Sequence, residues 1–103
     1  MKNMLDIQRM LKTAKEMQDK LQKEMAEMKV EGTSGGGMVT AVLDGRKHLL
    51  SLRVDPEVVN KDEIEMLQDL IVAAFNDAAA KVDEALSQKL GGLTGGLKIP
   101  GIG

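Results

Sequence analysis

The sequence contains no cysteine, one histidine and a single aromatic residue, Phe75. Without cysteine the chain has no disulfide framework, no thiolate nucleophile and no cysteine-ligated metal, which fits a reducing compartment. One histidine cannot build a histidine metal cluster. One aromatic ring cannot supply the stacking platform on which binders of single-stranded nucleic acid commonly hold the bases. These absences exclude disulfide-stabilised secreted domains, histidine- or cysteine-based metal centres and base-stacking binders.

Long hydrophobic runs are also missing. No stretch approaches the roughly 18 apolar residues that a membrane span needs, and the charged N-terminal segment lacks the apolar core of a signal peptide. We therefore expect a cytoplasmic protein with no membrane partner. Its 103 residues, 43% of them hydrophobic, suffice for about one domain with a core of its own.

The first part of the chain predicts a long helix over residues 3–29. Apolar residues recur there at spacings of three and four, as in the a/d seam of helices that pack on another helix. The seam comprises Met4, Ile7, Leu11, Ala14, Leu21, Met25 and Met28, with Gln18 in its one polar slot and Met10 and Met17 at one side. Such a helix would be about 40 Å long, longer than so small a domain can cover. The seam could be intramolecular core, or part of it could contact a second chain.

From Met38 the apolar period changes to two, which predicts β-strands. Asp44-Gly45 separates two alternating runs and indicates a hairpin, because both positions of such a turn favour positive φ. A further strand over residues 28–33 would complete a three-stranded antiparallel sheet. The triple glycine at 35–37 lacks the Gly-Lys-Ser/Thr signature and the following helix of a phosphate-binding loop, so a bulged turn between strands is expected.

After Asp55-Pro56 a second helix is predicted, with Asp62 as its N-cap and an apolar, alanine-rich stripe that reaches about Leu90. The fold class is therefore α+β: a long N-terminal helix, a small three-stranded antiparallel sheet and a long second helix. We expect a single domain over residues 1–90 and a flexible glycine-rich tail over residues 91–103.

Charge is unevenly distributed along the chain. The whole sequence has a formal net charge of −2, but residues 1–23 have a balance of +3 and residues 55–85 a balance of −7. Most cations of the first helix fall on the face opposite the apolar seam. A solvated helix face is one interpretation, and a nucleic-acid contact is the other, since clustered positive charge allows an acidic protein to bind DNA. The candidate DNA-binding residues are Lys2, Arg9, Lys12, Lys15, Lys20, Lys23 and Lys89.

No motif supports catalysis. Ser34, Asp44 and His48 could be grouped as a triad only by residue type, because their spacing gives no support. We expect no enzyme activity, no cofactor, no metal and no small-molecule substrate. The polar pair Asn76-Asp77, in an otherwise apolar stretch, predicts hydrogen bonds from the second helix to the sheet or to another chain.

Several strings in the chain are specific. They are Gly37-Met38-Val39 leading to Asp44-Gly45, Val54-Asp55-Pro56, Glu65-Met66-Leu67-Gln68-Asp69-Leu70 and Ala73-Ala74-Phe75-Asn76-Asp77-Ala78. These strings resemble those of the YbaB/EbfC family of bacterial nucleoid-associated proteins. The resemblance extends over essentially the whole chain. It implies a small cytoplasmic, nucleoid-located protein that binds double-stranded DNA as a tweezer-like homodimer, organises the nucleoid and influences gene expression.

The family's strings do not mark DNA contacts, so the basic candidates above rest on charge alone. We expect contacts mainly to phosphates, with weak sequence preference. The candidate dimer interface comprises Val39, Ala41, Leu43, Leu50, Leu52 and Phe75. The alternative is a non-catalytic adaptor that binds a protein partner through the Met/Leu seam or the acidic second helix.

Overall fold

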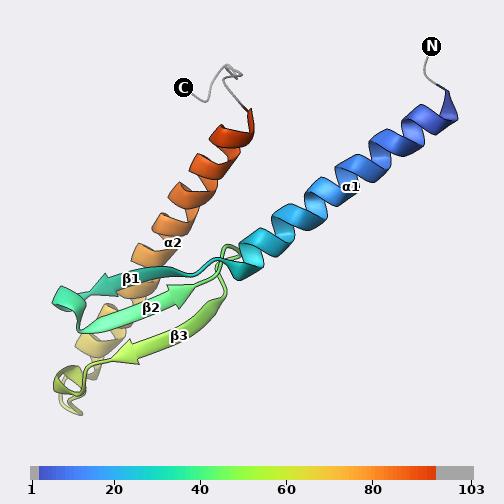
Figure 1. Ribbon diagram of the computed structural model, residues 1–103. Coiled ribbons are helices and arrows are strands. Elements are labelled where there is room, and N and C mark those ends of the chain that lie inside the picture. The colour runs from blue at the N-terminus through green and yellow to red at the C-terminus, as the bar shows by residue number, and fades with distance from the viewer. Residues whose placement is uncertain (1–2, 95–103) are drawn as a thin grey trace.

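The computed structural model describes residues 3–94, with the side chains of residues 3–91 (Figure 1). Its elements are α1 (Met4–Glu27), β1 (Val30–Ser34), η1 (Gly35–Gly37), β2 (Val39–Leu43), β3 (Leu49–Val54), η2 (Pro56–Val58) and α2 (Ile64–Thr94). The predicted α+β order is confirmed. The second helix continues four residues past Leu90 and so includes Gly91, whereas the rest of the predicted tail lies outside the described residues.

The three strands form one antiparallel sheet in the order β1-β2-β3. Gly32 of β1 lies opposite Ala41 of β2, which in turn lies opposite Leu52 of β3. The register shifts at the end of β2, so that Leu50 has no residue opposite it. The glycines of η1 connect β1 to β2 with φ values of 60°, 67° and 93°, a backbone conformation that L side chains rarely adopt.

One helix covers the sheet: α2 packs across β1 and β2. The core consists of two adjoining clusters, one of Val39, Ala41, Val58 and Ala74 and one of Leu43, Ala78 and Val82. Alternate residues of a β-strand point to the same face. Val39, Ala41 and Leu43 of β2 therefore all point into this core.

Three residues of the predicted dimer interface take part in this packing. Val39, Ala41 and Leu43 have no exposed surface within a single chain, because α2 already covers the apolar face of β2. Their side chains therefore lie in the intrachain core. Leu50 and Leu52 remain 48% and 40% exposed.

The backbones of β1 and α2 approach unusually closely at Gly32. A Cβ atom on this glycine would lie 2.1 Å from the Ala78 amide nitrogen and 2.4 Å from the Ala74 carbonyl oxygen. Asp77 secures the same contact, because its Oδ2 accepts hydrogen bonds from the Thr33 amide at 2.9 Å and from the Lys81 ammonium at 3.0 Å. Both hydrogen bonds lower the pKa of Asp77, and the bond from the Thr33 backbone amide has the larger effect. The predicted hydrogen bond between the second helix and the sheet is confirmed.

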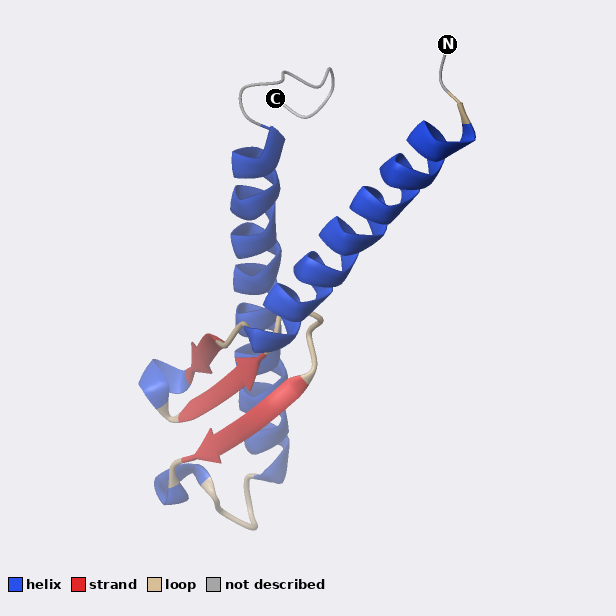
Figure 2. Cartoon of the chain, turned by 45° about the vertical axis from the view of Figure 1, so that its right-hand side comes forward, coloured by secondary structure: helices blue, strands red, loops and turns tan. Residues whose placement is uncertain are grey.

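By contrast, α1 projects away from this body. Asn3 caps its N-terminus by accepting a hydrogen bond from the Asp6 amide at 3.0 Å, and none of its 24 residues is buried. Figures 1 and 2 show both helices leaving the same end of the sheet and diverging, with α1 close to the body only at its C-terminal end. The molecule is elongated as a result, with extents of 72 × 27 × 16 Å.

Candidate nucleic-acid interface

The projecting helix α1 presents two different faces to solvent. Its large apolar side chains are unusually exposed: Met4 by 75%, Leu11 by 65% and Met17 by 61%. Helical geometry at 3.6 residues per turn places Arg9, Lys12, Lys20 and Lys23 within about 80° of one another, opposite this seam. Lys15 lies closer to the edge of the seam.

The cations of α1 are exposed, and the helix also carries five acidic residues, so that its formal net charge over Met4–Glu27 is zero. Arg9, Lys12, Lys15, Lys20 and Lys23 are all exposed, and over residues 3–94 none of them makes an ion pair. Lys2 lies outside the described residues. Ammonium and guanidinium groups that run along about 21 Å of helix can reach phosphates over several base pairs.

Lys89, the remaining candidate, is in a different situation. Its Nζ lies 3.6 Å from Oε2 of Glu24, and the two side chains are 43% and 42% exposed. The ion pair joins α2 to the last turns of α1. Part of the charge of Lys89 is therefore compensated within the chain, and its contact has a structural consequence that the sequence pattern did not show.

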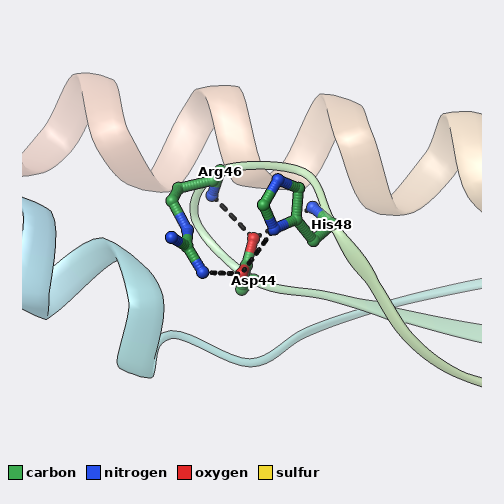
Figure 3. Close-up of polar contacts among 3 residues, drawn as sticks. All are labelled: Asp44, Arg46 and His48. Carbon is green, nitrogen blue, oxygen red and sulfur yellow. Dashed lines mark hydrogen bonds and ion pairs between the residues drawn. The ribbon is translucent and has the colours of Figure 1, made fainter.

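The β2–β3 turn is organised around one buried carboxylate (Figure 3). Asp44 is 1% exposed. Its Oδ1 accepts hydrogen bonds from the backbone amides of Arg46 at 2.8 Å and His48 at 2.9 Å, and its Oδ2 lies 3.2 Å from the Arg46 guanidinium and 3.6 Å from Nδ1 of His48. The bond from the His48 amide is the largest of the effects that lower the pKa of Asp44, and it outweighs the opposing desolvation.

The turn differs from the two-residue hairpin that Asp44-Gly45 predicts. The residue with positive φ is Lys47, at 65°, and Gly45 is outside that region. Gly45 is needed for a different reason: a Cβ there would lie 2.8 Å from the Met25 carbonyl oxygen at the end of α1. The Gly45 amide also donates a 2.8 Å hydrogen bond to that carbonyl. Lys47 in turn contacts Asp83 of α2 at 2.7 Å. Sequence reasoning missed these contacts, since each joins residues distant in the chain.

The same geometry argues against a catalytic triad. Asp44 and His48 do meet, but Ser34 lies opposite Val39 at the far end of β2 and donates its hydroxyl hydrogen bond to the Leu70 carbonyl. Within the described part of the chain, no three His, Cys, Asp or Glu side chains gather where they could hold a metal ion. No described helix is long and apolar enough to cross a membrane.

A compact helix-on-sheet body thus holds α1, with a row of exposed cations on one of its faces, clear of itself. The sequence model of the YbaB/EbfC DNA-binding family matches residues 1–97, and the chain belongs to that family. The resemblance seen in the sequence is thus confirmed.

Individual relatives agree with this assignment. A nucleoid-associated protein of Caldanaerobacter subterraneus subsp. tengcongensis is 47% identical, with 94% of this chain and 90% of that protein covered. One of Koribacter versatilis is 45% identical, with 93% and 95% covered. The crystal structure of an uncharacterized Helicobacter pylori protein superimposes with a TM-score of 0.75 at 22% identity, over 92% of this chain and 100% of that one. The last comparison shows a shared fold.

Proposed function

We propose that this protein binds double-stranded DNA as a homodimer, mainly through phosphate contacts from α1, and so organises the nucleoid and influences gene expression. The observation that carries the proposal is the row of exposed, unpaired cations on a helix that projects from the body. Family membership and relatives named as nucleoid-associated proteins support it.

Weak sequence preference follows from the composition of this surface. Arginine is the residue that most often reads guanine, through bidentate hydrogen bonds, and Arg9 is the only one of the chain's three arginines on α1. Lysine ammonium groups contact phosphates as point charges, which positions a protein without reading bases.

The second copy is expected at β3. The sheet has two edge strands, β1 and β3. At β1 the Thr33 amide already donates a hydrogen bond to Asp77 of α2, which favours β3. An open edge offers unpaired backbone groups to another chain, and Leu49, Leu50 and Leu52 add exposed apolar area there. Phe75 is half-buried beside the core. Of the predicted dimer residues, Leu50, Leu52 and Phe75 therefore remain in the proposal.

The test is fluorescence anisotropy with a labelled duplex of about 30 base pairs, which offers more than the 6–10 phosphate contacts of a typical site. We expect Lys12→Glu/Lys20→Glu to weaken binding by at least about 100-fold, because each lost contact costs about tenfold at 0.1 M salt. The matched control is Lys29→Glu/Lys61→Glu, which changes net charge equally on the body. Equal affinity of both variants would contradict the assignment to α1.

A protein-binding adaptor is the second candidate, because the apolar seam of α1 is exposed along most of its length. The same variants separate the two functions. Binding to a protein partner would survive Lys12→Glu/Lys20→Glu and high salt but fail when Met17 or Leu21 becomes Glu, since apolar contacts are not screened by ions. Absence of duplex binding at low salt would favour this candidate.

A further inference from the structure

The direction of α1 is determined by very few contacts. Figure 2 shows the helix close to the rest of the chain only at its C-terminal end, and its first five turns have no buried side chain. Because α1 contacts the rest of the chain only at its C-terminal end, a small change in orientation there displaces the whole helix. The residues at that end therefore determine where the cations of α1 lie.

The tightest contact at the base is made by Gly45. Its amide donates to the Met25 carbonyl at 2.8 Å. A Cβ atom at this position would lie 2.7 Å from Sδ of Met28, 2.8 Å from the Met25 carbonyl oxygen and 2.9 Å from the Met25 Cα. The methionine sulfur could move aside, but the two Met25 backbone atoms could not without displacing the helix. Because the φ of Gly45 is not positive, alanine fits the turn itself, and α1 is what excludes it.

Three further contacts lie at the base of α1. The Asp44 carboxylate fixes the turn internally through the amides of Arg46 and His48. Lys47 joins the turn to Asp83 of α2. The ion pair between Glu24 and Lys89 joins α1 directly to α2. The turn therefore contacts both helices at the point where they diverge.

We infer that the β2–β3 turn is the joint that sets the angle between α1 and α2, with Gly45 as the positioning residue and the Glu24–Lys89 pair as a brace. For DNA binding the inference rests on the proposed function: in a homodimer, this angle sets the separation of the two basic helices, and hence how many phosphates they reach together.

The angle can be measured without DNA. Because the chain has no cysteine, Gln8→Cys on α1 and Ser87→Cys on α2 take spin labels uniquely, and pulsed electron resonance gives their distance distribution. A large excess of unlabelled chain keeps the labelled pairs within one protomer. Ser51→Cys with Ser87→Cys reports the body alone.

In Gly45→Ala, the Gln8–Ser87 distribution should shift or broaden while the Ser51–Ser87 distribution stays the same. Duplex affinity should fall by about tenfold, with a shallower salt dependence because fewer phosphates are reached. Gly91→Ala is the matched control, since a Cβ there has no neighbour within 4 Å among the described side chains, and it should change neither distance. A folded Gly45→Ala with an unchanged Gln8–Ser87 distribution would overturn the inference.

The brace supplies a second test in case Gly45→Ala does not fold. Glu24→Lys places two ammonium groups together and should move the Gln8–Ser87 distribution, and adding Lys89→Glu should restore it. An unmoved distribution in Glu24→Lys would then overturn the inference. If the wild-type protein binds no duplex, the DNA proposal fails, whereas the distances still decide whether the turn is the joint.

Discussion

At the scale of single residues, glycine is required at two positions because neighbouring backbone atoms leave no space for a Cβ. Gly32 lets β1 contact the α2 backbone, and Gly45 lets the turn contact the end of α1. Neither has a positive φ, unlike the three glycines of η1. Their backbones could accept alanine, but the space beside them could not. Substitutions at these two positions therefore probe packing between elements rather than backbone strain.

Gly32→Ala should destabilise the fold by about 3 kcal/mol or more, because its Cβ would overlap backbone atoms on α2 that no side-chain rotation can move. Urea unfolding at neutral pH measures the change. Gly91→Ala, on open surface, serves as the control. A loss of stability no larger than that of the control would mean that β1 and α2 are not in contact at this position.

Asp44 predicts a pH dependence of stability. Its pKa in the folded protein lies below the ordinary value of 3.8, so ionised Asp44 favours the folded state. This stabilisation is complete above about pH 4 and is lost as the pH falls through the lowered native pKa. We expect Asp44→Asn to be less stable than the wild type at pH 7, since the amide cannot accept from both partners of Oδ2.

Urea unfolding from pH 7 down to pH 3 checks this. The difference between the two proteins should stay constant at neutral pH and shrink in acid. Asp62→Asn, at an exposed aspartate whose carboxylate has no hydrogen bond to a backbone amide among the described residues, is the control and should change little. A difference that grows toward pH 3 would show that Asp44 is not ionised in the folded state.

At the scale of elements, β3 is the edge strand at which the second copy is expected, and its apolar residues determine the next prediction. Leu52→Asp should convert the proposed homodimer into a monomer at micromolar concentration, because a carboxylate would be desolvated at the proposed interface. Light scattering after size-exclusion chromatography measures the mass. Ser51→Asp, on the neighbouring exposed residue, is the matched control. A dimeric Leu52→Asp would mean that the second copy binds elsewhere.

Most elements were predictable from a clear apolar period: three and four in α1 and α2, and two in β2 and β3. β1, with the sequence Val-Glu-Gly-Thr-Ser, has no such period and was expected only as the strand that completes the sheet. The sequence did not predict which element or chain covers each apolar face. The alternation of Val39, Ala41 and Leu43 predicts one buried side, but a second chain or α2 would produce the same alternation. Similarly, Asp44-Gly45 marks a turn in the sequence, whereas the contact of Gly45 with Met25 depends on how distant segments pack.

In the candidate DNA-binding surface, too, some properties could be predicted from the sequence and others could not. Exposure of the α1 cations could be anticipated from their position opposite the seam. The pairing of Lys89 with Glu24 could not, because these residues are 65 positions apart in the sequence and no local pattern relates them. Charge patterns identify surfaces, and only the fold shows which charges are already compensated.

At the scale of the whole molecule, the salt dependence of duplex affinity tests whether binding is electrostatic. If α1 neutralises phosphates, log affinity should fall linearly with log salt, with a slope of about −0.9 per phosphate contacted. Lys12→Glu/Lys20→Glu should make that slope shallower as well as lower the affinity, whereas Lys29→Glu/Lys61→Glu should leave it unchanged. An unchanged slope in the first variant would mean that its effect is not electrostatic.

The length of the molecule also separates its charges. The cations of α1 lie toward one end, and the acidic residues of η2 and the start of α2, such as Glu57, Glu63 and Glu65, lie toward the other. The chain is therefore an electric dipole along its long axis, despite its small net charge. Approaching a duplex, it would turn its basic tip forward before contact, and the repelled acidic end would remain facing outward from the bound DNA.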